Sequence, residues 1–278
     1  MLPSFLGIGV PRAGTTWLYK LLAAHPDVYV PLRRKEVHFF DSNYERGVQW
    51  YKKFFPPDDA AARYQAIGEI TPHYLFHPRC PERIAATLQD PKLIVILRNP
   101  VDRAYSHYLF RARVANYTGS FEGFLSSCRE AIQWGFYSQG LRNYLRYFSR
   151  DKILVLIYEI AVVDVHKTME ALANFLGIAV ARFPPNVGFE RINPSYIPKW
   201  RSLYALATNV AHVLRNKYEL DWVVNLAKRL GIKQVFGQSG SVPPMKEQTK
   251  KFLRGIYEKE IEKLEAILEI DLRCWKQV

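Results

Sequence analysis

Cysteine and long apolar segments are both scarce in this sequence. It has three cysteines in 278 residues, and no two of them form a C-x-x-C pair. This scarcity argues against a disulfide-rich fold and against a thiolate zinc site. No segment approaches the roughly 20 apolar residues that span a bilayer, and no basic stretch followed by an apolar one opens the chain. We therefore expect no membrane span, and either a cytoplasmic protein or a domain cut from a longer chain.

Metal-binding patterns are also lacking, and acidic residues are outnumbered. Five of the histidines share no regular spacing with carboxylates or cysteines, so we predict no metal site; they are His25, His77, His107, His166 and His212. Lys and Arg number 39 against 26 Asp and Glu, a formal charge of +13. This excess attracts polyanions, but without a helix-turn-helix, zinc-finger or RNP motif we expect no nucleic-acid partner. An anionic cofactor, an acidic acceptor or a solvated basic surface each accounts for such charge.

The first motif is a glycine-containing turn near the amino terminus. The apolar run Phe5-Leu-Gly-Ile-Gly9 predicts a buried strand, and a helix follows from Thr15. The spacing Gly9-x-x-x-x-Gly14-Thr15-Thr16 is that of a phosphate-binding P-loop. Such a turn points backbone N–H groups and a helix N-terminus at one anion. A nucleotide triphosphatase needs Lys directly after the second glycine, whereas here the cation of the loop is Arg12.

A carboxylate for Mg²⁺ is missing from the expected place. Kinases and ATPases hold the metal with a carboxylate that follows a second strand. The best later strand, Lys92-Leu-Ile-Val-Ile-Leu97, ends instead in Arg98 and Asn99. The loop therefore suits a phosphate-like group that protein cations neutralise. A P-loop nucleotide-dependent kinase and a non-catalytic nucleotide-binding module remain the alternatives.

A second motif, Arg98-Asn-Pro-Val-Asp-Arg-Ala-Tyr-Ser106, follows that strand. Pro100 suits the first turn of a helix, which places Ser106 about two turns into it. Arg98 and Ser106 together suit a separate phosphate monoester through charge-assisted hydrogen bonds. One loop for a diphosphate-like group and a second pair for another phosphate describe 3′-phosphoadenosine 5′-phosphosulfate (PAPS).

These two motifs resemble the cofactor loops of PAPS-dependent sulfotransferases. Two intervening motifs, Lys35-Glu-Val-His-Phe-Phe-Asp41 and Gly68-Glu-Ile-Thr-Pro72, are similar to the branch that contains heparan sulfate sulfotransferases and polyketide-synthase-associated sulfotransferase domains. The resemblance runs in order from about residue 5 to the C-terminal helix. It implies PAPS as donor and PAP as product, no metal, and a hydroxyl acceptor such as a glycan or an acyl chain on a carrier protein. The implied cofactor-binding residues are Arg12, Ala13, Gly14, Thr15, Thr16, Trp17, Arg98 and Ser106.

Two residues compete for the role of general base. Glu36 stands where the resembled glycan-modifying enzymes place their catalytic carboxylate, and its aromatic neighbours suggest a raised pKa. His73 follows a predicted strand and needs little tuning to accept a proton near pH 7. Glu36 forming only a salt bridge, or His73 only packing beside Tyr74, are the competing interpretations. We expect both to participate, with His73 slightly favoured as base. Arg12 is expected to stabilise the departing phosphate.

Three further residues have expected supporting roles. Lys35 or Lys92 is a candidate second cation at the departing phosphate. Glu69 is expected to support Arg12 or His73. The carbohydrate-modifying members usually carry Lys where this chain has Arg12, which leaves the class of acceptor open.

The apolar pattern predicts an α/β fold of the P-loop type. Apolar runs at 5–10, 66–70, 92–97 and 152–157 read as buried parallel strands. The stretches that read as helices are 15–24, 46–55, 79–88, 100–114, 121–133 and 138–149. This alternation predicts a parallel sheet with helices on both faces and ligands at the strand carboxyl ends. We expect one domain over 1–278, with an α/β core at 5–182 and a mainly helical part at 183–278. Within that part, 190–201 is expected to close over the nucleotide or acceptor, with Lys199 and Arg201 as cations.

Overall fold

The structure is a computed structural model that describes residues 1–189, 197–198, 200–216, 218–229, 238–239 and 244–276. These residues fall into two compact units. The first comprises 1–100, 136–192 and 258–278, and the second comprises 101–135 and 193–257. That the whole chain acts as one domain stays a prediction. The expected closing segment, 190–201, lies mostly outside the described residues.

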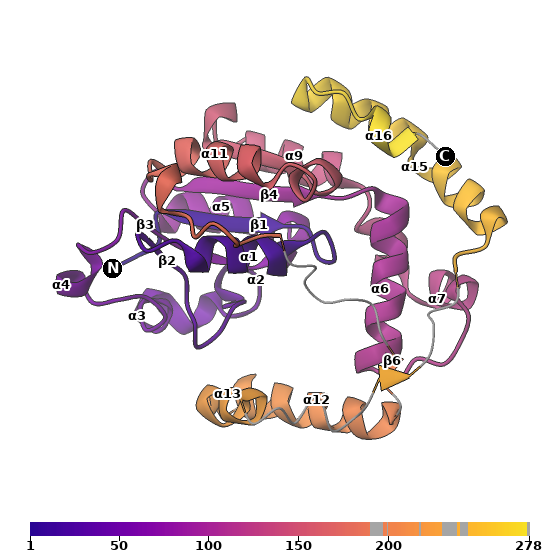
Figure 1. The fold of residues 1–278 in the computed structure, drawn as a ribbon, viewed down its shortest axis with the longest axis horizontal. Helices are drawn as coiled ribbons and strands as arrows, with labels where there is room; N and C mark the ends of the chain where they lie inside the picture. Colours follow the sequence, from indigo (N-terminus) through magenta and orange to yellow (C-terminus); the bar gives the residue numbers. More distant parts are fainter. Residues whose placement is uncertain (190–196, 199, 217, 230–237, 240–243, 277–278) are drawn as a thin grey trace. The chain divides into compact units, whose positions relative to one another are not determined.

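A five-stranded parallel sheet forms the centre of the first unit (Figure 1). Its spatial order is β2-β3-β1-β4-β5, and Phe5 of β1 aligns with Gly68 of β3 and with Lys92 of β4. The central strands are apolar and buried along nearly their whole length, as strands covered on both faces require. The strands are β1 (Phe5–Gly9), β2 (Val28–Tyr29), β3 (Ala66–Ile70), β4 (Lys92–Leu97) and β5 (Ile153–Ile157).

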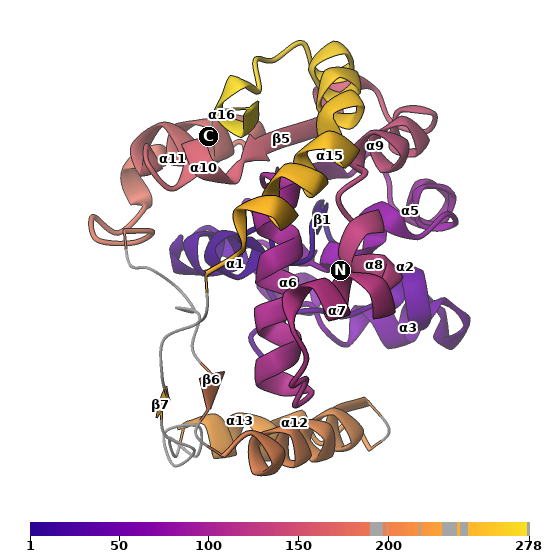
Figure 2. The ribbon, with the colours of Figure 1, turned by 90° about the vertical axis from the view of Figure 1, so that its right-hand side faces the viewer.

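Helices cover both faces of this sheet, which confirms the predicted α/β architecture. Figure 2 shows α1, α10 and α11 on one side and α5 and α9 on the other. Leu18 and Leu21 of α1 pack in one core cluster with Leu172 of α11 and Ile94 of β4. The bounds are α1 (Thr15–Ala24), α5 (Cys80–Thr87), α9 (Tyr137–Leu145), α10 (Tyr158–Ala161) and α11 (Val165–Leu176).

Short helical elements fill the connections of the first unit. The segment after β2 contains α2 (Phe39–Ser42), η1 (Tyr44–Arg46), α3 (Gly47–Lys52) and α4 (Asp58–Ala61). The 3₁₀ turn η2 (Pro72–Phe76) follows β3 directly. The remaining elements are η3 (Arg150–Lys152), η4 (Val180–Arg182) and α16 (Arg273–Lys276).

The second unit is mainly helical. Its helices are α6 (Pro100–Val114), α7 (Phe121–Ser127), α8 (Arg129–Gln133), α12 (Arg201–Asn216) and α13 (Asp221–Arg229). A short antiparallel pair joins β6 (Ile197–Pro198) to β7 (Gln238–Ser239). The helix α15 (Glu247–Leu268) contributes residues to both units. In the part of the chain described, no helix has both the length and the apolar character needed to cross a bilayer.

Candidate active site

The turn between β1 and α1 has the backbone that an anion-binding loop requires. Arg12 and Gly14 both adopt positive φ, at 71° and 98°. A Cβ atom on Gly14 would lie 2.4 Å from the ring of Tyr158, so only glycine fits. The Ala13 amide closes the turn by donating to the Val10 carbonyl at 3.1 Å. Helix α1 begins at Thr15, and the amides of its first turn have no acceptor within the helix. They form the positive end that favours an anion.

Two predicted loop residues have fixed surroundings. Trp17 is buried, and its indole N–H donates to the Gly188 carbonyl at 2.7 Å. Its side chain is therefore engaged elsewhere, and only its backbone amide suits the anion-binding role predicted for the loop. Arg98 follows β4 at the same edge of the sheet, because β1 and β4 are adjacent and parallel. Its Nη1 donates to the Arg12 carbonyl at 3.3 Å, and its guanidinium carbon lies 5.1 Å from the Tyr158 ring centroid. Arg98 therefore supports the loop and adds a second cation there.

Ser106 lies in α6, which begins at Pro100 as the sequence predicts. It belongs to the second unit, whereas Arg98 belongs to the first. Their pairing around one phosphate stays a prediction.

Lys35 connects the loop to the candidate bases. Its Nζ donates to the hydroxyls of Thr15 and Thr16 at 3.4 and 3.1 Å, and to Glu36 Oε1 at 3.0 Å. Lys92 opens β4, at the amino end of the strand, and therefore at the opposite edge of the sheet. Of the two cations that the sequence left open, only Lys35 lies at the loop.

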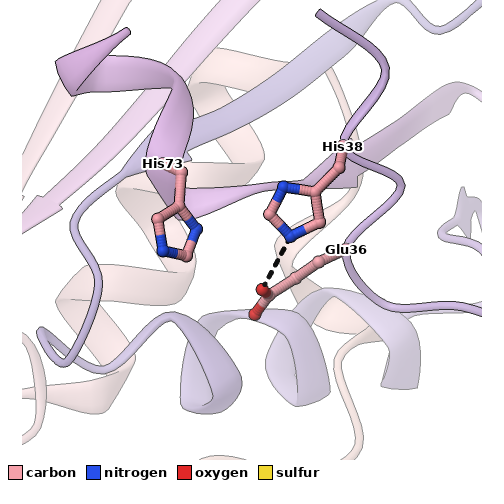
Figure 3. A group of neighbouring side chains, drawn as sticks. All are labelled: Glu36, His38 and His73. Carbon is pink, nitrogen blue, oxygen red and sulfur yellow. Dashed lines mark ion pairs between the residues drawn. The ribbon is translucent and has the colours of Figure 1, made fainter. Parts of the chain in front are cut away.

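Glu36, His38 and Asp41 form a chain of ion pairs after β2. His38 contacts Asp41 through Nδ1 at 2.7 Å. It contacts Glu36 through Nε2 at 3.5 Å, the ion pair drawn in Figure 3. Burial alone would raise the pKa of Glu36, but Lys35 and His38 outweigh it and hold that pKa well below its ordinary value. The expected raised pKa of Glu36 is therefore wrong: its cationic neighbours, not its aromatic ones, decide its charge. Burial likewise opposes a charge on His38, yet hydrogen bonds to Asp41 and Glu36 raise its pKa to about 10.

His73 reaches the same point from a different strand. It lies in η2, directly after β3, and its ring centroid is 5.3 Å from that of His38. Figure 3 shows the His73 ring and the Glu36 carboxylate directed toward one another. Burial lowers the pKa of His73, although the charge of Glu36 partly opposes this shift. Near pH 7 the cluster thus combines an ionised carboxylate, an imidazolium and a neutral imidazole.

The same three side chains form a set of metal-ligand type. One ligand atom each from Glu36, His38 and His73 lies within 4.8 Å of the others. Imidazole and carboxylate are ligands that zinc accepts, but the Lys35 ammonium already provides a cation 3.0 Å from Glu36. That the site works without a metal stays a prediction.

Glu69 supports the turn that carries His38, through two residues that flank His73 in the chain. Its carboxylate accepts hydrogen bonds from the hydroxyls of Thr71 and Tyr74, each at 2.7 Å. Thr71 in turn accepts the His38 amide at 3.3 Å, and Tyr74 accepts the Phe39 amide at 2.9 Å. Burial raises the pKa of Glu69 to about 7, against the effect of these hydrogen bonds.

The family model for the sulfotransferase domain matches residues 2–207. A curated mouse relative, heparan sulfate glucosamine 3-O-sulfotransferase 3B1, is 34% identical over 186 residues, which cover 64% of this chain and 46% of the relative. The human heparan sulfate glucosamine 3-O-sulfotransferase 6 is 35% identical over 184 residues, covering 63% of this chain and 52% of that protein. The chain thus spans about half the length of these curated relatives.

Two solved structures share the fold. A sulfotransferase from Alicyclobacillus acidocaldarius superposes with a TM-score of 0.65 at 24% identity, over 100% of both chains. The sulfotransferase domain from the curacin biosynthetic pathway superposes with a TM-score of 0.51 at 16% identity, over 69% of this chain and 79% of that domain. At these sequence identities, both similarities show a shared fold and nothing more.

Proposed function

The chain belongs to the sulfotransferase family, and on that premise we propose that it transfers a sulfuryl group from PAPS to a hydroxyl acceptor. One observation carries the proposal. The Lys35 ammonium bonds both to the hydroxyls of the anion-binding loop and to Glu36, so the loop and the candidate bases form one connected site. Sulfuryl transfer needs such a connection, because negative charge develops on the departing phosphate as the acceptor loses its proton.

The residues at the loop fit the donor. Arg12, Lys35 and the first amides of α1 would hold its 5′-phosphate, and Arg98 with Ser106 would hold its 3′-phosphate. Bound there, PAPS would supply the sulfuryl group, as phosphoryl donors do in the related in-line displacement. The cations of the chain neutralise the departing phosphate, which electrostatic catalysis requires. A kinase is disfavoured because Thr15 occupies the lysine position of its loop and Arg98 follows β4 in place of a carboxylate.

Glu36 and His73 have separate roles at the acceptor hydroxyl. Glu36 stays ionised and orients the acceptor hydroxyl, while neutral His73 accepts its proton. The acceptor oxygen bonds to sulfur as the bond from sulfur to the phosphate oxygen breaks, which leaves a sulfate ester, PAP and a protonated His73. Asp41 holds His38 as an imidazolium, which keeps Glu36 ionised. The assignment of proton acceptor follows from the pKa directions, since Glu36 is too weak a base.

The acceptor is a hydroxyl on a glycan or on an acyl chain carried by a carrier protein. The names of the curated relatives support the glycan first. Radiolabelled PAPS incubated with heparan-type oligosaccharides and with β-hydroxyacyl carrier proteins tests both classes. Transfer to one of them that falls about 10²–10⁴-fold in His73→Ala and in Glu36→Gln supports the proposal. Transfer that is unchanged in both variants would remove these residues from the mechanism, and PAP binding without any transfer would indicate a binding module.

A further inference from the structure

Exposed apolar side chains gather on one pair of helices in the second unit. Among the described residues, 17 large hydrophobic side chains are exposed, and eight of them lie between positions 200 and 226. Isolated exposed hydrophobic residues are ordinary, whereas eight of them on and beside one pair of packed helices indicate a binding surface. We call this group the apolar surface; it comprises Trp200, Leu203, Leu206, Val210, Val213, Tyr218, Trp222 and Leu226.

The apolar surface is separate from the faces with which these helices pack. On α12, the spacing of Leu203, Leu206, Val210 and Val213 places them in one stripe. The buried Tyr204 and Ala205 lie outside that stripe. On the packed side, the Thr208 hydroxyl bonds to the Val114 carbonyl of α6 at 3.4 Å. Helix α12 therefore already has its own contact with the unit, and the stripe is a second apolar face.

The two helices form a hairpin with internal polar contacts (Figures 1 and 2). The Leu220 amide donates to the Leu214 carbonyl at 2.9 Å, and Arg215 pairs with the buried Asp221 at 3.1 Å. On α13, Trp222 and Leu226 are one helical turn apart and both exposed. Each helix thus has exposed apolar side chains in addition to the residues that contact the other helix or α6.

The sequence around the hairpin is strongly basic. Residues 199–233 contain seven Lys or Arg and two Asp or Glu, a net charge of +5. The rest of the chain carries the remaining +8 of the formal +13. A second copy, or the rest of the same chain, would bring positive charge against this segment, which electrostatic complementarity disfavours. Four of the seven cations are Lys, a residue depleted at protein interfaces.

We propose that the α12–α13 hairpin docks on the surface of an anionic lipid bilayer. Helices that lie in a membrane interface combine an apolar face containing Trp and Leu with an excess of Lys and Arg. Trp200, Tyr218 and Trp222 add the amphipathic rings that favour the headgroup region. Docking goes beyond sulfuryl transfer, and no side chain of the apolar surface is assigned to that reaction. It brings the enzyme to acceptors presented at a membrane.

Co-sedimentation of the full chain with lipid vesicles tests this docking. Vesicles of phosphatidylcholine with about one third phosphatidylglycerol should bind the protein at least tenfold more strongly than phosphatidylcholine alone, and added salt should weaken binding. The double variant Leu206→Glu/Val210→Glu should lose at least tenfold of this partitioning. Its matched control, Val163→Glu/Val180→Glu, replaces two exposed apolar residues of the first unit and should bind as the original chain does.

Tryptophan fluorescence gives a second readout, whose first part uses the unmodified chain. Brominated anionic lipids should quench the emission of the unmodified chain, and Trp222→Phe should reduce this quenching. Equal vesicle binding by the hairpin variant and its control would overturn the proposal. So would absence of binding together with self-association that the hairpin variant abolishes, since a second copy would then cover the surface. Neither result tests the sulfotransferase proposal, because vesicle binding is measured without PAPS.

Discussion

His38 and His73 lie with ring centroids 5.3 Å apart, yet their surroundings shift their pKa values in opposite directions. Two carboxylates flank His38 and raise its pKa to about 10. Burial dominates at His73 and lowers its pKa. One histidine is therefore a fixed cation across the physiological range, and the other is a neutral imidazole that can accept a proton. Residue identity alone does not distinguish these roles, whereas the position of Asp41 does.

The pH dependence of kcat/KM tests this division. A general base acts when deprotonated, and a lowered pKa extends its active range toward acid. The acid limb of the profile should therefore lie below about 6.5, the ordinary imidazole value. It should be absent from the residual activity of His73→Ala. An acid limb at or above the ordinary value, or one that survives this substitution, would contradict the assignment to His73.

Replacing Arg12, the cation of the loop, distinguishes a role in catalysis from a role in folding stability. Arg12→Ala should lower kcat by about 10²–10³-fold, the cost of removing one electrostatic donor from a transition state. The free energy of unfolding should change by less than about 1 kcal/mol, because Arg12 is only half-buried. Arg142→Ala, an exposed arginine on α9, is the matched control and should change neither quantity. Comparable losses of activity and stability in Arg12→Ala would make the residue structural.

At the scale of elements, the buried Glu69 joins β3 to the turn that begins α2. Its folded pKa of about 7 exceeds the ordinary value of 4.5. The folded state thus binds a proton that the unfolded state has lost, so stability falls as pH rises through this window. The full effect is about 3 kcal/mol, at about 1.4 kcal/mol for each pKa unit.

Urea unfolding at several pH values checks the behaviour of Glu69. The free energy of unfolding of the original chain should decline between about pH 4.5 and 7, and Glu69→Gln should remove most of that decline. The exposed Glu170→Gln on α11 should keep it. A decline of equal size in the Glu69 variant would show that another group titrates.

Ser106 of helix α6 is predicted to bind the second phosphate, the 3′-phosphate of the donor. Ser106→Ala should weaken adenosine 3′,5′-bisphosphate by about tenfold or more, the range of a hydrogen bond to a charged group. Binding of adenosine 5′-monophosphate, which lacks the 3′-phosphate, should stay the same. Ser126→Ala on α7 is a control with a serine in the same unit. An unchanged ratio between the two nucleotides would refute the role of Ser106.

The sequence predicts elements well where their signals are long or chemically unusual. The strands at 66–70 and 92–97 have the predicted bounds because their apolar runs are uninterrupted. The two-residue β2 escapes prediction, since it is too short to show a pattern. The helix at 165–176 escapes as well, although Asp164 caps it through the Lys167 amide and Gly177 ends it in a left-handed conformation. The predicted helix at 121–133 is interrupted at Cys128.

The features of the site likewise divide into those that the sequence predicts and those that it does not. Arg12, His73 and Arg98 could be placed at one edge of the sheet because each follows a predicted parallel strand. Glu36 came instead from the family resemblance, because the strand before it, β2, was not predicted. The pKa directions could not, since they depend on Lys35 and Asp41, whose contacts only the fold creates. The partners of Glu69 were likewise beyond the sequence, because Tyr51 comes from a separate helix.

At the scale of the whole molecule, positive charge is the common feature of site and surface. The formal charge of +13 exceeds what one nucleotide requires. Three cations, Arg12, Lys35 and Arg98, are assigned to the donor together with the N-terminal end of α1. Residues 199–233, the sequence that contains the α12–α13 hairpin, carry a further net charge of +5. Long-range attraction of anions therefore serves two proposed partners, a nucleotide and a lipid surface.

Titration calorimetry of the full chain with adenosine 3′,5′-bisphosphate decides whether the chain binds the donor nucleotide. We predict saturable binding of one nucleotide per chain without added metal, lost in Arg12→Ala and kept in Arg142→Ala. ATP with Mg²⁺ should compete weakly, because the loop lacks the lysine and the carboxylate that this ligand needs. Tight binding of ATP with Mg²⁺ and no heat with the bisphosphate would rule out a PAPS-dependent sulfotransferase.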